Sequence, residues 1–152
     1  MGKIVAVCMS EKKGIQKRNI GAGRLIEHHG LEGDAHAGKW HRQISLLALE
    51  SANIMREKGL TINDGDFGEN IVTEGMDLKT LPIGTTLKIG AGIVVRVTQI
   101  GKLCHDRCAF YYKAGDCIMP REGIFAEIVT GGTITVGDEI SILERGAAPK
   151  IT

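Results

Sequence analysis

Residues 85–100, TTLKIGAGIVVRVTQI, carry the pattern that decides the fold class. Two apolar runs, Thr85–Ile89 and Ile93–Ile100, flank Gly90-Ala91-Gly92, an arrangement typical of a β-hairpin. Isoleucine and valine recur at every second position at the start of the second run, so they share one face of a strand. The stretch therefore predicts two antiparallel strands with one apolar face.

Further strand patterns lie on both sides of this hairpin. Ile83–Ile89 resembles Val136–Ile142, since each places a glycine before an alternating strand, as expected where strands enter a barrel after a tight corner. Short strands separated by glycine-containing turns predict a mainly β protein built as a barrel. The other strand candidates are Lys3–Met9, Arg24–His28, Gln43–Leu49, Thr133–Val136 and Glu139–Leu143.

Two segments have helical patterns. A helix near residues 48–58 is expected to end at Gly59, with basic residues in its last turn. A second helix near residues 121–130 is expected to bury its isoleucines and to stop at Gly131-Gly132. We therefore expect two or three short α-helices beside the barrel, in a single domain that spans residues 1–152.

The composition narrows the possible functions. The chain has 152 residues, 43% of them apolar, which suits one domain with its own core. With 19 basic and 18 acidic residues the formal net charge is +1, so no overall basic field favours nucleic acid or an anionic membrane as partner. No apolar run approaches the ~18 residues of a membrane span, and no signal peptide is expected. The resulting expectation is a cytoplasmic protein with four reduced cysteines.

Three of the four cysteines cluster in one polar segment. Cys104-His105-Asp106-Arg107-Cys108 is followed nine residues later by Cys117. Histidine and arginine neighbours lower the pKa of a thiol and make it a better nucleophile or metal ligand. Two other interpretations stay open. The cysteines could be inert and packed in a core, or they could bind zinc with a distant histidine, although the spacing lacks a second knuckle.

A second polar segment, His36–Arg42, concentrates positive charge in a glycine-bearing loop. Lys39, His41 and Arg42 could hold a phosphate, because arginine gives paired hydrogen bonds to such a group. Trp40 offers a flat face to a ring. The alternative is a solvated basic turn with Trp40 anchored in the core.

Two weaker candidates complete the polar set. His36 lies two residues after Asp34 and is either a ligand or base, or a capped turn residue. Asp66–Asn70, DFGEN, consists of ordinary turn residues, although Asn70 can bond a backbone group or a ligand amide. No P-loop, dinucleotide-binding glycine motif or nucleophile elbow is present in the sequence. Nucleotide and serine-hydrolase chemistry are therefore not indicated.

Six longer segments occur in a fixed order: GLEGDAHAGKWHRQISLL, DFGENIVTEG, LPIGTTLKIG, VTQIGKLCHDRC, GDCIMPREGIFA and GGTITVGDEI. Together they resemble the MOSC domain, named for the C-terminal domain of molybdenum cofactor sulfurase, over about residues 3–145. The likeness is greatest to small single-domain bacterial members. It implies a MOSC-type β-barrel and a role in molybdenum cofactor metabolism or sulfur transfer.

The resemblance also implies site residues. In the family a cysteine in the segment matching CHDRC is functional, and in larger amidoxime-reducing relatives the pair matching Arg107-Cys108 includes the protein ligand of molybdenum. Other members carry a cysteine that matches Cys104 better, and Cys117 is a candidate resolving thiol. The full sulfurase has a pyridoxal phosphate domain for which this chain has no room, so no pyridoxal phosphate lysine is expected here. A sulfur transferase, an oxidoreductase component and a carrier all stay open.

The combined hypothesis is that the loops at residues 34–42 and 104–108 converge on one pocket for the molybdenum cofactor. The cofactor has a phosphate, a polar pterin and a soft metal, and a soft metal or a transferable sulfur needs a thiolate. The partners implied are this cofactor or a sulfur donor or acceptor protein. The alternative is a small zinc-binding or partner-interaction module without catalysis of its own. The expected assignments are the phosphate to Lys39, His41 and Arg42, the pterin to Asp34 and Asn70, and the metal or sulfur to Cys108, with Cys104 as second candidate.

Overall fold

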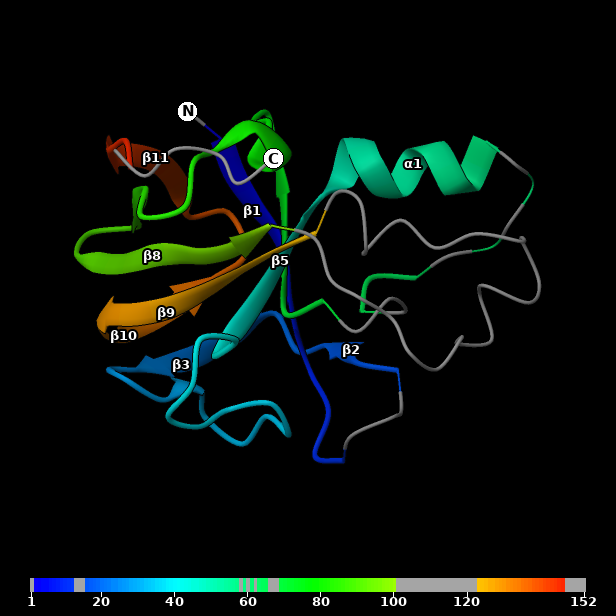
Figure 1. The fold of residues 1–152 in the computed structure, drawn as a ribbon. Helices are drawn as coiled ribbons and strands as arrows, with labels where there is room; N and C mark the ends of the chain where they lie inside the picture. Colours follow the sequence, from blue (N-terminus) through cyan, green and yellow to red (C-terminus); the bar gives the residue numbers. More distant parts are fainter. Residues whose placement is uncertain are drawn as a thin grey trace.

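The computed structural model of the chain describes residues 2–12, 16–57, 59, 61, 63–65, 69–100 and 123–146. Strands dominate these ranges, with one α-helix and one short 3-10 helix among them (Figure 1). The elements are β1 (Gly2–Met9), β2 (Arg18–Asn19), β3 (Ala22–Ile26), β4 (Gly30–Leu31), β5 (Ile44–Ala48), α1 (Leu49–Glu57), β6 (Ile71–Glu74), η1 (Leu78–Thr80), β7 (Thr86–Ile89), β8 (Ile93–Ile100), β9 (Ile124–Thr130), β10 (Gly132–Thr135) and β11 (Glu139–Glu144).

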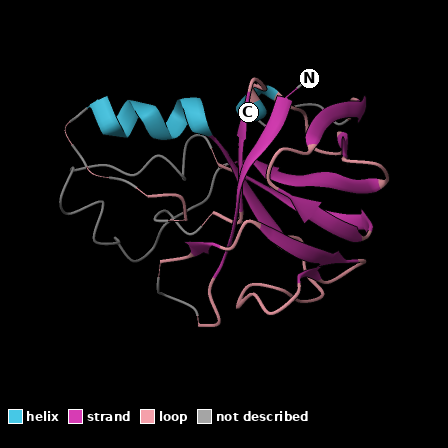
Figure 2. Ribbon diagram, turned by 180° about the vertical axis from the view of Figure 1, so that it is seen from behind, coloured by secondary structure: helices cyan, strands magenta, loops and turns pink. Residues whose placement is uncertain are grey.

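Seven strands close into a barrel in the order β11-β7-β8-β9-β5-β6-β1, and pairing of β1 with β11 completes the circle. The neighbours are antiparallel except β5 and β6, which run parallel and are connected through α1. Strand β2 pairs antiparallel with the end of β1. A separate small sheet has the order β10-β3-β4. Figure 2 shows α1 to one side of the strands. The mainly β barrel expected from the sequence is thus confirmed.

The predicted hairpin is present as β7 and β8, in the register Ile89↔Ile93. The two similar segments Ile83–Ile89 and Val136–Ile142 turn out to be neighbours, since their strands β7 and β11 pair antiparallel with Leu87 opposite Ile142. Gly84 and Gly137, which precede these strands, have φ of +93° and +98°. That backbone region favours glycine, so both positions are true corners.

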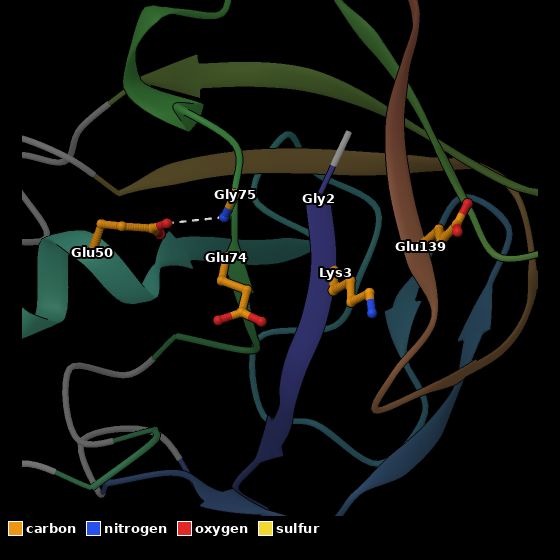
Figure 3. A pocket seen from close by; sticks show the side chains of 6 residues that line it. All are labelled: Gly2, Lys3, Glu50, Glu74, Gly75 and Glu139. Carbon is orange, nitrogen blue, oxygen red and sulfur yellow. Dashed lines mark hydrogen bonds between the residues drawn. The ribbon is translucent and has the colours of Figure 1, made fainter.

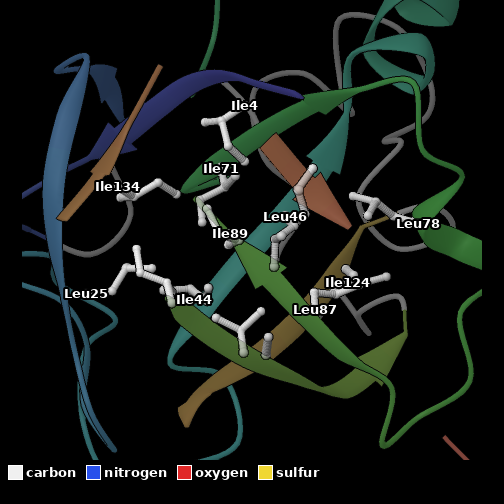
Figure 4. Close-up of a cluster of buried hydrophobic side chains, with 14 of the residues drawn as sticks. Ile4, Leu25, Ile44, Leu46, Ile71, Leu78, Leu87, Ile89, Ile124 and Ile134 are labelled. Atoms are coloured by element: carbon white, nitrogen blue, oxygen red, sulfur yellow. The ribbon is translucent and has the colours of Figure 1, made fainter. Parts of the chain in front are cut away.

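Aliphatic side chains from the barrel strands fill its interior (Figure 4). Val95 and Val97 of the hairpin are fully buried, as their alternation predicted. A smaller cluster of Ala6, Cys8 and Val72 lies on another face of the first strand. Cys8 is 0% exposed, so this cysteine is packed inside.

The helical predictions had mixed outcomes. The expected helix near residues 48–58 is α1, and among the described residues no helix combines the length and hydropathy of a membrane span. The helix expected near residues 121–130 is wrong over its described part, because Ile124–Thr130 forms β9 between β5 and β8. Ile124 and Ile128 are four residues apart, a spacing that fits one helix face as well as one strand face. Pairing with β5 on one side and β8 on the other makes this segment a strand and not a helix.

Candidate functional site

The loop between β4 and β5 contains most of the predicted binding residues, and a buried ion pair fixes its first half. Lys17 Nζ lies 2.8 Å from Asp34 Oδ1, and the two side chains are 1% and 0% exposed. Asp34 also accepts hydrogen bonds from the backbone N–H of Ser10, at 3.1 Å, and of His36, at 3.1 Å. Burial alone raises the pKa of the Asp34 carboxyl, but the hydrogen bond and charge of Lys17 outweigh it and hold this pKa below its usual value.

Lys17 has two further partners besides the carboxylate. Its Nζ lies 2.9 Å from His36 Nδ1 and 3.3 Å from Ser10 Oγ. The backbone N–H of Lys17 donates to the carbonyl of Gly65 at 3.0 Å. Sequence reasoning missed both Lys17 and Ser10, because each stands among polar neighbours where side chains are usually solvated.

Asn70, the other residue expected to bind the pterin, lies next to Asp34. Its side chain hydrogen-bonds the carboxylate of Asp34 and helps to lower the pKa of that group. Its Oδ1 accepts from the backbone N–H of Ser45 at 3.0 Å, and its Nδ2 donates to the carbonyl of Cys8 at 3.1 Å. Asn70 is 1% exposed and Asp34 6%. The two predicted pterin partners are therefore together, but each is buried and bonded to protein groups.

The second half of the loop is tied to the barrel by Gln99 of β8. Gln99 Oε1 lies 3.1 Å from Arg42 Nε and 3.0 Å from His41 Nε2. The hydroxyl of Thr98 donates to the carbonyl of His41. Two of the three predicted phosphate-binding residues thus meet at one side chain that the sequence did not single out, because Gln99 is a polar residue within a strand.

The guanidinium of Arg42 lies near two aromatic rings. Arg42 Cζ lies 5.9 Å from the centroid of the Trp40 ring and 5.2 Å from that of Phe125 on β9. Trp40 is 39% exposed, and its Nε1 donates to the carbonyl of His36 at 2.8 Å. Trp40 is therefore not anchored in the core, which corrects that part of the alternative interpretation of this turn. Lys39 is exposed and makes no hydrogen bond or ion pair with the described residues.

Two cavities are lined by residues that the structure describes. One of about 330 Å³ adjoins the Lys17 cluster through their shared residue Ser10 and carries both Lys12 and Arg18. The other, of about 440 Å³, lies at the start of β1 and the end of β6 (Figure 3). It is lined by Gly2, Lys3, Glu50, Glu74, Gly75 and Glu139, none of which was predicted as a site residue.

The cysteine segment lies outside the described residues, and with it Cys104, Arg107, Cys108 and Cys117. Its predicted convergence with the 34–42 loop stays a prediction. The described chain stops at Ile100 before this segment and resumes at Gly123 after it. Ile100 and Ile124 are paired between β8 and β9. In the ranges that the structure describes, no three histidine, cysteine or acidic side chains are grouped as metal ligands.

These features define a class of protein: a small closed β-barrel in which the polar loops between β1 and β2 and between β4 and β5 contact each other. The model of the MOSC domain family matches residues 33–141. Because this match spans well over half of the chain, the protein belongs to the MOSC domain family. A search of curated protein sequences gives no significant match.

Solved structures agree with this fold. The YuaD protein from Bacillus subtilis superposes with a TM-score of 0.75 at 20% identity, over 92% of this chain and 94% of that one. YiiM from Geobacillus stearothermophilus gives a TM-score of 0.76 at 21% identity, over 97% and 77% of the two chains. YiiM from Escherichia coli gives 0.64 at 17% identity, over 96% and 72%. Likeness at such identity establishes the barrel fold.

Proposed function

We propose that this MOSC domain binds the molybdenum cofactor, or carries sulfur on a reactive cysteine, with the 34–42 loop receiving the anionic end of the ligand. The observation that supports this most directly is the geometry of Arg42. Its Nε is bonded to Gln99, and its guanidinium lies near the rings of both Trp40 and Phe125. Among the described residues, neither terminal amino group of Arg42 has a hydrogen-bond partner.

A guanidinium held in this way suits a phosphate. Its planar fork presents two parallel N–H donors to two oxygens, and such charge-assisted bonds are the stronger kind. Because the rings and Gln99 already fix the side chain, little rotamer freedom is lost when an anion binds. The exposed ammonium of Lys39 adds a second positive charge to the same loop. The residues present therefore fit the phosphate end of the cofactor.

The other end of the ligand requires a thiolate. When bound, the cofactor supplies a redox-active metal that prefers soft sulfur ligands. Cys108, which Arg107 precedes in the sequence, is the proposed residue for this role, and Cys104 is the second candidate. Cys104 follows Ile100 by four residues, which an extended chain spans in at most about 14 Å. Ile100 adjoins Gln99, so the length of chain between Ile100 and this cysteine is compatible with its proposed role at the Arg42 end.

The sulfur-carrying form of the proposal has its own requirements. A persulfide on Cys108 or Cys104 needs a sulfur donor protein and an acceptor, so these are the expected partners. It also needs free thiols, which a reducing compartment such as the cytoplasm maintains.

Cofactor retention after expression in a host that makes the cofactor tests the proposal. Molybdenum and pterin fluorescence are measured in the wild type, and persulfide is measured after exposure to a cysteine desulfurase. The proposed function is contradicted if the wild type retains no molybdenum and pterin and also forms no persulfide.

Variants then locate the two ends of the ligand. Arg42→Ala is expected to weaken cofactor binding by about 10- to 100-fold, the equivalent of one charge-assisted bond. Arg145→Ala, which removes an exposed arginine from the end of β11, is the matched control. Cys108→Ser is expected to lose metal or sulfur. Unchanged binding in Arg42→Ala would remove the phosphate assignment, and loss in Cys104→Ser alone would move the chemistry to that cysteine.

A further inference from the structure

The single tryptophan of the chain lies in the same loop as the proposed anion-binding residues. Trp40 is 39% exposed, although a tryptophan side chain is large and usually well covered. Six other large apolar side chains are exposed in the described ranges, and all six are aliphatic. Single aliphatic residues on a surface are common and need no explanation. An exposed indole ring that is also held in place is a different case.

Hydrogen bonds and ring contacts hold Trp40 in position. Its Nε1 donates to the carbonyl of His36 at 2.8 Å, and its backbone N–H donates to the carbonyl of Gly38 at 3.0 Å. The guanidinium carbon of Arg42 lies 5.9 Å from the ring centroid, and the imidazole of His41 meets the ring at a centroid distance of 5.8 Å and an angle of 67°. The polar end of the indole is therefore satisfied within the loop, and the ring is positioned before any ligand binds.

A fixed and partly exposed aromatic ring suits a flat ligand. Planar heterocycles stack on tryptophan through their π faces, and such stacking depends on planarity more than on a pattern of hydrogen bonds. Because the ring of Trp40 is already fixed, little freedom is lost when a ligand stacks on it. Arg42 lies next to this ring, so a molecule that combines a phosphate with a planar ring through a short linker can reach both side chains.

We infer that Trp40 is a binding residue of the proposed site: it stacks on the planar nitrogen heterocycle of a ligand whose phosphate binds Arg42. The inference rests on the proposed function and narrows the ligand to a phosphorylated heterocycle, because a bare oxyanion such as phosphate or molybdate has no ring to stack. Hydrogen bonds of the kind expected from Asp34 and Asn70 reach only the edge of a pterin, whereas Trp40 supplies contact for its face. Pterins and purines share this chemistry, so the test includes both.

Equilibrium dialysis of the full chain against three probes tests the inference. The probes are hydroxymethylpterin phosphate, guanosine monophosphate and inorganic phosphate. We expect the wild type to bind the pterin phosphate about 5- to 100-fold more tightly than inorganic phosphate, the range for stacking of one base on an aromatic side chain. Quenching of the single tryptophan should accompany binding of the pterin phosphate and not of inorganic phosphate. Equal affinity for these two probes would overturn the inference.

Two variants of Trp40 separate stacking from the hydrogen bond of the indole. Trp40→Leu and Trp40→Phe both remove the N–H donor to His36, but only phenylalanine keeps an aromatic face. We expect Trp40→Leu to bind the pterin phosphate about 5- to 100-fold more weakly and Trp40→Phe to retain most of the affinity, with little change for inorganic phosphate in either. Leu143→Ala, at a 57% exposed position of β11, is the control and should bind as the wild type does. Equal losses in the two Trp40 variants, or an equal loss for both of these probes, would overturn the inference.

Cofactor retention separates this inference from the proposed function. If the wild type binds the pterin phosphate through Trp40 but retains no molybdenum and pterin and forms no persulfide, the proposed function fails and the inference stands. If the wild type retains the cofactor and Trp40→Leu retains as much, the inference alone fails. Tighter binding of guanosine monophosphate than of the pterin phosphate, with the same dependence on Trp40, would support the stacking role and contradict the pterin as ligand.

Discussion

The two ends of the loop between β4 and β5 are fixed in opposite ways. At one end Asp34 and Lys17 are fully buried and bonded to protein groups. At the other end the guanidinium of Arg42 lies near two aromatic rings and is bonded to one glutamine, and its terminal amino groups have no hydrogen-bond partner among the described residues. The difference indicates that the two ends have different roles. The buried end sets the position of the loop, and the half-exposed end is the part able to bind a ligand. Variants at each end should therefore affect different measurements.

The largest effect is expected when the buried end loses its cation. Lys17→Met leaves the Asp34 carboxylate buried without a counter-charge, which should lower the free energy of unfolding by about 3–5 kcal/mol. Urea denaturation measures this loss. Lys12→Met, at an exposed position, is the control and should change stability by less than about 0.5 kcal/mol. If the two methionine variants are equally stable, the buried ion pair does not fix the loop. Adding Asp34→Asn to Lys17→Met should recover part of the loss.

A smaller loss is expected at Asn70, which joins the buried end to the barrel. Asn70→Ala leaves the backbone N–H of Ser45 and the carbonyl of Cys8 without their side-chain partner, at a cost of about 1–3 kcal/mol. Thermal unfolding of the variant checks this. Asn53→Ala, on the exposed face of α1, is the matched control. An Asn70 variant as stable as this control would show that the buried amide is dispensable.

At the half-exposed end, the loss of a hydrogen-bonding side chain should affect ligand binding more than stability. Gln99→Leu removes the acceptor shared by His41 and Arg42, so stability should fall by no more than about 1 kcal/mol. Cofactor affinity should fall because the guanidinium is no longer held in one orientation. Titration with cofactor, beside an unfolding curve, separates the two quantities. A large loss of stability without loss of affinity would reverse the proposed division between the ends.

The smallest change in the free energy of unfolding is expected when the pH is lowered. Burial raises the pKa of Asp34 while Lys17 lowers it, so the two influences partly cancel. This pKa is lower in the folded chain than the ~3.9 of an unfolded aspartate, so the carboxylate contributes stability above that value. The contribution disappears as the pH falls through the folded pKa. Unfolding curves between pH 5 and 2 should therefore decline less steeply in Asp34→Asn than in the wild type. Parallel curves would mean that Asp34 adds nothing to the acid sensitivity.

The sequence was most informative where local patterns and the final sheet agree. The hairpin at Gly90 was predictable because alternation and turn residues lie next to one another in the chain. The helix expected near residues 121–130 was wrong because an i, i+4 pair of isoleucines also fits a strand, and the choice depends on β5 and β8, which are distant in sequence. Pairing of that kind leaves no local signal.

The candidate site was predictable in part for the same reason. The loop residues Lys39, His41 and Arg42 could be chosen from their charge and the neighbouring glycine. Lys17 and Gln99 could not, since burial converts an ordinary polar residue into an anchor only after the chain has brought it to its partner. Each lies far along the chain from the loop residue that it holds.

Closure of the barrel through β1 and β11 has a consequence for how the chain reaches this state. Gly2 lies opposite Ile140, so the last circular contact joins residues near the two ends of the described chain. Pairings so distant in sequence raise the contact order, and chains with high contact order fold slowly. The same closeness places both ends at one rim of the barrel, a geometry in which circular permutation is usually tolerated. The order in which the strands are connected is therefore less important to the barrel than the order in which they lie side by side.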